Sequence, residues 1–141
     1  MVTTGESLTT PVRAVPITVI QRVLDLGCGR NKLAGAVGVD RNPASQADLL
    51  CDLDSIPFPF RADSFDEIRM SHVIEHLGDV VAVMAEICRI ARHGARVFIA
   101  TPHFSSVHSY TDPGHRQRLA RGVLRSGPQG LTAGSEYRSV A

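Results

Sequence analysis

The 141-residue sequence has few cysteines, almost no excess of charge of either sign and no long apolar run. Its three cysteines, Cys28, Cys51 and Cys88, are odd in number and widely spaced, which argues against a disulfide framework and favours a reduced, intracellular protein. A net charge of +1 gives no reason to expect a nucleic acid or a membrane as partner. No apolar run approaches the roughly 20 residues of a membrane span. Residues 1–10 lack the basic start and apolar core of a signal peptide, so a cytoplasmic location is expected.

The most informative segment is a short apolar strand that runs into a turn with two glycines. Its residues are Val23-Leu24-Asp25-Leu26-Gly27-Cys28-Gly29, and a second apolar segment ends in Asp40, eleven residues after Gly29. Glycine lets a ligand approach the main chain closely, because it has no Cβ, and it accepts positive φ angles. Asp40 offers two acceptor oxygens, enough to hold both hydroxyls of a ribose. The pattern therefore predicts a nucleoside-binding site at the carboxyl ends of the strands of an α/β sheet.

A dinucleotide-binding fold is the obvious alternative. Its fingerprint has glycine at the first, third and sixth positions and a ribose-binding acid roughly 20 residues further on. Here Lys32 stands at the sixth position, and Asp40 comes too early. The spacing therefore argues against a dinucleotide.

Six short motifs match the order and spacing of one enzyme family between about Val23 and Pro102. They are Asp25-Leu26-Gly27-Cys28-Gly29, Gly38-Val39-Asp40, Cys51-Asp52-Leu53, Ile56-Pro57-Phe58, Ser64-Phe65-Asp66 and Ser71-His72-Val73-Ile74-Glu75-His76-Leu77. In this register the chain resembles the class I S-adenosylmethionine-dependent methyltransferases of the small-molecule type 11 kind. Asn31 replaces the third glycine of the family, a mild departure because Asn tolerates a left-handed backbone. The resemblance implies an enzyme that transfers a methyl group directly to a small-molecule acceptor.

Strands and helices are expected to alternate, which predicts a parallel sheet. We expect strands at residues 17–26, 36–39, 48–52, 65–70 and 95–101. Residues 79–92 form the strongest predicted helix, with Asp79 at its N-terminus and His93-Gly94 at its C-terminus. The connection 30–36 is too short for the usual helix, and Pro57-Phe58-Pro59-Phe60 cannot be helical and is expected to wrap the adenine side. The resemblance implies a Rossmann-like α/β sheet with the strand order 3-2-1-4-5.

The resemblance also implies S-adenosylmethionine as cofactor. The expected cofactor-binding residues are Asp25, Gly27, Cys28, Gly29, Asp40, Arg41, Asp52, Leu53, Ser71 and His72. Asp40 is expected to bind the ribose, and Asp52 with Leu53 to lie beside the adenine, although Asp52 also suits a turn that caps the following loop. Asp25 either lies near the methionine end of the cofactor or stabilises the glycine loop. Cys28 is not expected to be a nucleophile, because no base follows it at a recognisable spacing.

The segment His72-Val73-Ile74-Glu75-His76 has the form of an inverted zinc-protease motif. On a helix it would place two histidines one turn apart, with Glu75 as general base. The segment directly follows a predicted strand, however, and no third ligand is indicated, so no metal site is expected. Ser71 and His72 are instead expected to line the ligand pocket, and Glu75 or His76 to orient the start of a helix.

No catalytic residue is assigned, because the sulfonium methyl group is already activated and positioning supplies most of the catalysis. His93 is expected to act as a cation at a helix C-terminus. The side chains expected where an acceptor would enter are His103, His108, Tyr110, Asp112 and His115. One of these histidines is a candidate general base, and a polar surface loop is the alternative.

The C-terminal part departs from the family pattern. From Arg116 onward there are five arginines and one acid, with scarcely any strand pattern. The chain looks truncated or altered after about residue 117, and the last two strands of the fold are expected to be missing. The predicted organisation is a flexible N-terminus (1–14), a cofactor-binding core (15–116) and an irregular basic tail (117–141). The fifth strand would then have an open edge, which invites self-association.

Three interpretations of function stay open. The chain is an active methyltransferase for a small molecule, a truncated and inactive relative, or a non-catalytic binding module that a partner strand completes. The acceptor and the methylated atom cannot be derived from the sequence, because function on a shared fold depends on the site.

Overall fold

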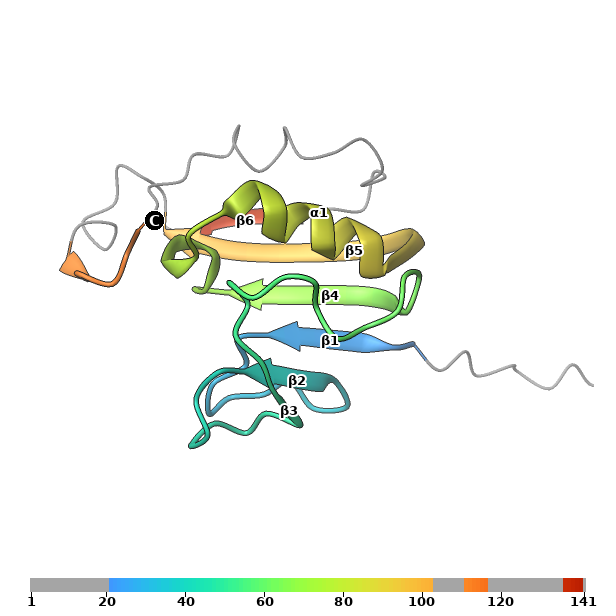
Figure 1. The fold of residues 1–141 in the computed structure, drawn as a ribbon, viewed down its shortest axis with the longest axis horizontal. Coiled ribbons are helices and arrows are strands. Elements are labelled where there is room, and N and C mark those ends of the chain that lie inside the picture. The colour runs from blue at the N-terminus through green and yellow to red at the C-terminus, as the bar shows by residue number, and fades with distance from the viewer. Residues whose placement is uncertain (1–20, 103–110, 117–135, 141) are drawn as a thin grey trace, which may run out of the picture.

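A single parallel sheet organises the protein. A computed structural model describes residues 21–102 and 111–116, together with the backbone of residues 136–140. In this part of the chain six strands form one sheet in the order β3-β2-β1-β4-β5-β6, and all neighbouring pairs are parallel (Figure 1). The strands are β1 (Val23–Leu26), β2 (Val37–Asp40), β3 (Leu49–Leu50), β4 (Phe65–Ser71), β5 (Ala91–Pro102) and β6 (Glu136–Val140).

The strand order confirms the predicted arrangement 3-2-1-4-5. Strand β1 pairs with β2 on one side, where Leu24 is opposite Val37, and with β4 on the other side, where Leu24 is opposite Ile68. The chain therefore builds the sheet outward from β1 in two opposite directions. In an open α/β sheet, ligands bind in the crevice outside the carboxyl ends of the strands at such a reversal. The glycine turn after β1 lies at this place.

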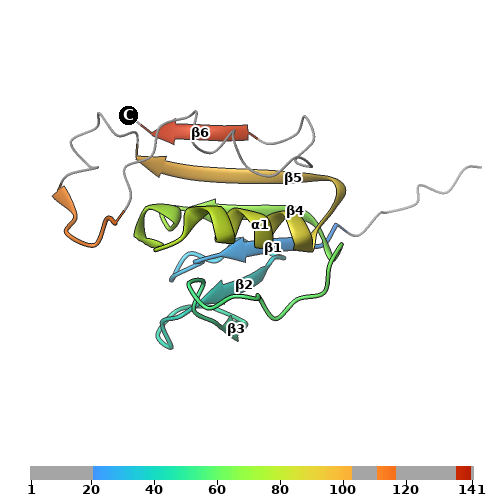
Figure 2. The same cartoon turned by 45° about the horizontal axis from the view of Figure 1, so that its top comes forward.

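One face of the sheet is buried under the helix α1 (Val80–Ile90), as Figure 2 shows. Along β1, β4 and β5, apolar side chains at every second residue point into this core. The buried strand residues include Leu24, Leu26, Ile68, Met70, Val97 and Ile99, and those of the helix are Val83, Met84, Ile87 and Ile90. Burial of each large apolar side chain contributes about 1.5–3 kcal/mol, so this face provides most of the stabilisation of the fold.

Helix α1 begins where the sequence predicts and ends earlier. The side chain of Asp79 accepts a hydrogen bond from the Ala82 amide at 2.9 Å, which caps the N-terminus. The predicted extension to Arg92 is wrong, because the amide of Ser64 binds the carbonyl of Ile90 at 2.8 Å and the chain then joins β5. Within the described residues, no helix is long and apolar enough to cross a membrane.

The exposed residue His93 consequently lies in β5 and not at a helix C-terminus, so the role predicted for it is also wrong. The pairing of β4 with β5 shifts between Phe65 and Glu67, and Gly94 takes a φ of +76° in this irregular part of β5. The positive φ angle of Gly94 thus belongs to an irregularity in the strand and not to the end of a helix, and glycine suits both.

Two connections lack a helix, as predicted. Residues 30–36 contain turns and no helix, and residues 57–60 are not helical. The latter segment is fixed to α1, because the amide of Phe58 donates to Glu86 Oε2 at 2.7 Å and the guanidinium of Arg89 donates to the Phe60 carbonyl at 2.8 Å. The Arg89 guanidinium, with help from the Phe58 amide, lowers the pKa of the Glu86 carboxyl. The loop is therefore held by a largely buried ion pair.

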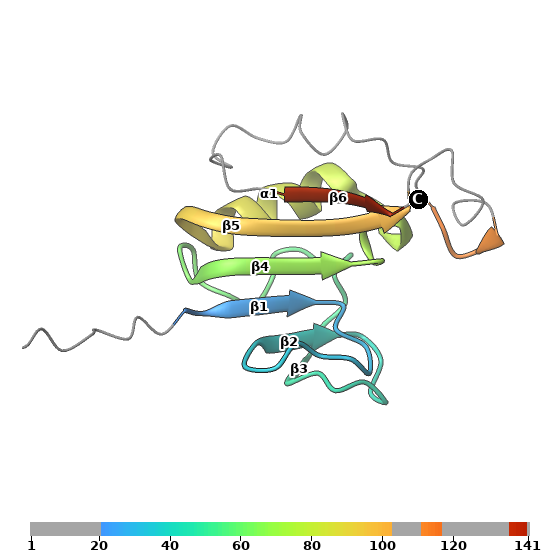
Figure 3. The same cartoon turned by 180° about the vertical axis from the view of Figure 1, so that it is seen from behind.

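Figure 3 shows the opposite face of the sheet, which no described helix covers. Its central feature is the buried carboxylate of Glu67, which pairs with Arg69 at 2.6 Å and with Arg96 at 2.8 Å. The guanidinium of Arg69 also lies 5.0 Å from the centre of the Phe98 ring. Both arginines are about half exposed, so each pair contributes at most about 1 kcal/mol.

The C-terminal strand corrects one sequence prediction. We expected an irregular tail over residues 117–141 and an open edge on the fifth strand. The segment β6 instead pairs in parallel with β5, with Phe98 opposite Glu136 and Pro102 opposite Val140. An unpaired strand edge accepts any extended segment through its main-chain groups, so a weak side-chain pattern is sufficient there. The predicted domain boundary at residues 14–15 lies outside the described part of the chain.

Candidate functional site

The glycine turn after β1 is fixed in a conformation that only glycine adopts readily. Gly27 and Gly29 have φ angles of +70° and +53°. The amides of Gly27 and Cys28 both donate to the carbonyl of Val39, at 2.7 and 3.1 Å, which ties the turn to β2. A Cβ on Gly27 would overlap the side chain of Val73. The positive φ angle expected of this turn is present, and the group that approaches Gly27 closely is the side chain of Val73.

Asp40 ends β2 and faces this turn. Its Oδ2 accepts a hydrogen bond from the Gly29 amide at 2.8 Å, and its Oδ1 accepts one from the Asn42 amide at 2.8 Å. Each oxygen of Asp40 thus has one main-chain partner. A carboxylate has about four acceptor positions, so both oxygens can still bind hydroxyl groups of a ligand.

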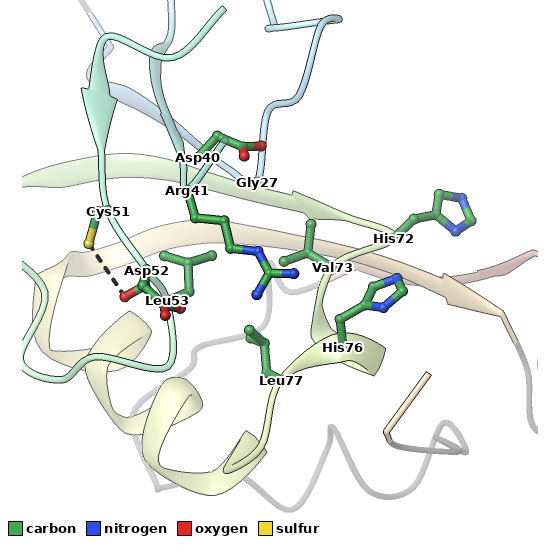
Figure 4. Close-up of a pocket in the computed structure, with 10 residues that line it drawn as sticks. All are labelled: Gly27, Asp40, Arg41, Cys51, Asp52, Leu53, His72, Val73, His76 and Leu77. Atoms are coloured by element: carbon green, nitrogen blue, oxygen red, sulfur yellow. Dashed lines mark hydrogen bonds between the residues drawn. The ribbon is translucent and has the colours of Figure 1, made fainter. Parts of the chain in front are cut away.

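A cavity of about 270 Å³ opens at the carboxyl ends of β1, β2 and β4 (Figure 4). It is lined by Gly27, Asp40, Arg41, Cys51, Asp52, Leu53, His72, Val73, His76 and Leu77. Six of the ten predicted cofactor-binding residues line it: Gly27, Asp40, Arg41, Asp52, Leu53 and His72. Segments far apart in the sequence thus converge on one hollow, at the place where the strand order predicts a ligand.

The other four predicted residues, Asp25, Cys28, Gly29 and Ser71, do not line the cavity. Asp25 is buried, and its Oδ2 accepts a hydrogen bond from the Leu33 amide at 2.9 Å, which favours the loop-stabilising alternative. Gly29 holds Asp40, as described above. Burial raises the pKa of the Cys28 thiol, and the carboxylates of Asp25 and Asp40 raise it further, so Cys28 is poorly suited to be a nucleophile. Ser71 is exposed at the end of β4.

The loop after β3 forms one wall of the cavity. The amide of Cys51 donates to the carbonyl of Asp40 at 3.0 Å, and Asp52 Oδ1 accepts a hydrogen bond from the Asp54 amide at 3.0 Å. Asp52 therefore serves as the predicted turn acid and lines the cavity at the same time. Asp54 accepts a hydrogen bond from the Gly78 amide at 2.8 Å and so ties this wall to the segment before α1.

His72 stands at the junction of two cavities. It has a φ of +54°, which is strained for a residue with a Cβ, and its amide donates to the Ala100 carbonyl at 2.7 Å. A second cavity of about 350 Å³ adjoins the first, and His72 and His76 line both. Its lining is His72, Glu75, His76, Pro102, Thr111, Asp112 and His115.

The segment predicted to start a helix forms the 3₁₀ turn η1 (Ile74–His76). Glu75 is buried there, its Oε2 accepts a hydrogen bond from Thr101 Oγ1 at 2.9 Å, and its carbonyl accepts one from the Arg116 amide at 2.7 Å. Of the side chains expected where an acceptor would enter, Asp112 and His115 line the second cavity, and His103, His108 and Tyr110 lie outside the described residues.

Four residues of the first cavity were missed from the sequence. They are Cys51, Val73, His76 and Leu77. All four lie in motifs that carry the resemblance, and Cys51 and Val73 stand directly beside predicted residues. Their position within these motifs could have identified them as lining residues. They were missed because an apolar side chain, or a cysteine or histidine without an obvious partner, does not by itself indicate contact with a ligand.

The parallel sheet with strand order 3-2-1-4-5 and the glycine turn, acid and cavity at its carboxyl edge define a class I methyltransferase domain of the Rossmann-like type. S-adenosylmethionine is the cofactor of this class. A family model described as "Methyltransferase domain" matches residues 11–128, and the chain belongs to that family.

Curated relatives and solved structures agree with this assignment. The chain is 31% identical to the ubiquinone biosynthesis O-methyltransferase of Hahella chejuensis, over 57% of this chain and 43% of that protein. It is 29% identical to the protein of the same name from Rhizobium etli, over 57% of this chain and 40% of that protein. The chain thus matches less than half the length of these relatives.

Among solved structures, a SAM-dependent methyltransferase from Archaeoglobus fulgidus superposes with a TM-score of 0.65 at 22% identity, over 74% of this chain and 57% of that one. A methyltransferase from Bacillus halodurans superposes with a TM-score of 0.63 at 14% identity, over 74% of this chain and 59% of that one. At these identities the similarity shows the shared fold.

Proposed function

We propose that this chain binds S-adenosylmethionine in the first cavity and transfers its methyl group to an oxygen atom of a small molecule in the second. The observation that supports this most is the convergence of Gly27, Asp40, Asp52 and His72 on one hollow at the reversal of strand order. The names of the curated relatives support an oxygen acceptor.

Different residues of the first cavity contact different parts of the donor molecule. Asp40 binds the ribose hydroxyls through the acceptor positions that Gly29 and Asn42 leave free. Asp52 and Leu53 lie beside the adenine, on the wall formed by the loop after β3. Gly27 lets the reactive end of the donor approach the main chain. When bound, the donor supplies a methyl group that is activated by the positive sulfur.

The second cavity is suited to an acceptor, because it adjoins the first through His72 and His76. An acceptor there contacts imidazole and carboxylate groups, which accept a proton when a hydroxyl group is methylated. The geometry of the two cavities sets the acceptor beside the donor, and this positioning provides most of the rate enhancement.

Calorimetric titration of the purified chain with S-adenosylmethionine tests the proposal, with Asp40→Asn as the informative variant. Asp48→Asn is the matched control, because Asp48 also accepts a main-chain hydrogen bond, from Gly38 at 2.7 Å, and does not line the cavity. We expect saturable binding by the wild type and by Asp48→Asn, and binding at least about tenfold weaker by Asp40→Asn.

Equal loss in both variants would show that the effect is structural, and absence of binding by the folded wild type would exclude this donor site. Methyl transfer from labelled donor to a panel of phenols then tests activity separately. Donor binding without any transfer would support the inactive interpretation.

A further inference from the structure

The second cavity contains a cluster of one carboxylate and two imidazoles that the sequence did not bring together. Glu75, His76 and His115 each place one candidate ligand atom within 4.8 Å of the others. Glu75 is 2% exposed and its Oε1 has no hydrogen-bond partner. A buried carboxylate oxygen without a donor is costly, so this atom indicates that the protein alone does not complete the site.

The distances do not fit a hydrogen-bonded His-Glu pair. His115 Nε2 is 3.9 Å from Glu75 Oε1 and 3.6 Å from Asp112 Oδ2, whereas N–H···O hydrogen bonds span about 2.7–3.2 Å. Zinc lies about 2.0–2.2 Å from nitrogen and oxygen ligands, so two ligands of one tetrahedral ion lie about 3.3–3.6 Å apart. The separation between His115 and Glu75 is slightly longer than this and leaves room for an ion between them. The ligand atoms of the cluster all lie within 4.8 Å of one another, so the cluster closes onto a tetrahedral ion with shifts of about an ångström.

The orientation of His76 provides a second, independent indication. Its Nδ1 lies 2.9 Å from the carbonyl of Gly114, and because a carbonyl only accepts, Nδ1 is the protonated nitrogen. The other nitrogen, Nε2, then carries a free lone pair. Metal-binding histidines are held in this way, with one ring nitrogen on a carbonyl and the other on the ion.

Thr101 and Asp112 support the other members of the cluster. Thr101 Oγ1 donates to Glu75 Oε2 at 2.9 Å, which leaves Oε1 directed toward the histidines. Asp112 Oδ1 accepts a hydrogen bond from the Gly114 amide at 2.7 Å and so fixes the turn that carries His115. Glu75 and His76 are thus held by hydrogen bonds, whereas only the backbone that carries His115 is fixed, and Nδ1 of His115 is buried without a hydrogen-bond partner.

We propose that Glu75, His76 and His115 bind one divalent transition-metal ion of the zinc type. Two imidazoles and one carboxylate favour zinc, cobalt or iron over magnesium and calcium, which prefer oxygen ligands. The site departs from the sequence expectation of no metal. The motif pairs His72 with His76, but the structure places His115 in the cluster and leaves His72 half exposed at its edge.

Three protein ligands leave one coordination position open toward the cavity, as in catalytic zinc sites. The role of the ion rests on the proposed function: it binds the hydroxyl oxygen of the acceptor and lowers its pKa, and the proton passes to the carboxylate of Asp112, which lines the same cavity and is not one of the three ligands, before methylation. Binding of the ion itself requires neither the donor nor the acceptor.

The test is titration of the metal-free 141-residue chain with Co²⁺, followed by visible absorption, and competition with Zn²⁺. We expect one Co²⁺ per chain with the intense ligand-field absorption of a tetrahedral or five-coordinate site. His115→Ala and Glu75→Gln are expected to weaken binding at least about tenfold. His93→Ala is the control, because His93 is exposed in β5 outside the cluster. Circular dichroism of each variant without metal identifies any loss of folding.

No binding by the wild type, or equal binding by folded His115→Ala, would overturn the inference. Thiolate-to-cobalt charge-transfer absorption would also overturn it, since it would place the ion on a cysteine. The proposed function has its own readout, because calorimetric titration with S-adenosylmethionine is performed on the metal-free protein. A failure of either titration therefore leaves the result of the other intact.

Discussion

Substitution of Gly27 tests the geometry of the glycine turn most directly. An alanine at φ +70° pays the cost of a left-handed backbone, about 1–2 kcal/mol. Its Cβ also overlaps Val73, and overpacking typically costs about 1–3 kcal/mol. We therefore expect Gly27→Ala to lower the free energy of unfolding by about 2–5 kcal/mol.

Gly29→Ala is the matched control for this prediction. Gly29 has a φ of +53°, but a Cβ there meets no atom within 4 Å. Only the backbone term applies, so Gly29→Ala is expected to cost about 1–2 kcal/mol. Urea unfolding of the two variants measures the difference, which isolates the overlap with Val73.

A double-mutant cycle with Val73→Ala completes this test. Truncation of Val73 removes the overlapping atoms, so Gly27→Ala is expected to cost less in that background, with a coupling of about 1 kcal/mol or more. Equal costs for Gly27→Ala and Gly29→Ala, together with no coupling to Val73, would refute the close packing on which the shape of the cavity depends.

Three further predictions follow from single contacts. Asp79→Ala is expected to cost about 1 kcal/mol in urea unfolding because it removes the cap of α1, and Asp79→Ser is expected to restore most of it. The folded pKa of Glu86 lies below its unfolded value of about 4.3, so its contribution is present above that pH and is lost as the pH falls through the folded pKa. Glu86→Gln is therefore expected to flatten the acid limb of a stability-pH profile, and an unchanged limb contradicts the assignment. The pKa of Asp66 is lowered chiefly by the hydrogen bond that its carboxylate accepts from the Arg22 amide at 2.8 Å. Asp66→Asn is expected to flatten the acid limb of the profile less than Glu86→Gln does, because Asp66 is more exposed.

The sequence predicted the sheet well because its signals were local. The apolar run before Gly27 is typical of a buried strand, and the prolines at 57 and 59 restrict the backbone by themselves. The end of α1 was predicted less well. His93-Gly94 resembles a helix C-terminus, but the amides of Asp63 and Ser64 bind the last helical carbonyls instead. Such a contact joins residues far apart in sequence and leaves no local pattern.

In the candidate site, too, the local features were predicted and the long-range contacts were not. Asp40 and the glycine turn were recognisable, because a ligand that lies against the main chain restricts which residues can stand there. The roles of Asp25 and Cys28 could not be recognised from the sequence. An aspartate that accepts a hydrogen bond from the Leu33 amide looks the same in a sequence as an aspartate that binds a ligand. Which side chains reach a cavity is set by packing on neighbouring strands.

The sequence alone determined a parallel α/β sheet, the place of the glycine turn and the acid that faces it, since these depend on strand periodicity and on the backbone freedom of glycine, and the resemblance to the methyltransferases implied the strand order. Only the tertiary structure decided that β6 covers the edge of β5 and that Glu75 and His76 meet His115. The physical reason is distance along the chain: His115 follows Glu75 by 40 residues, and only the folded sheet brings the two side chains within reach of one ion.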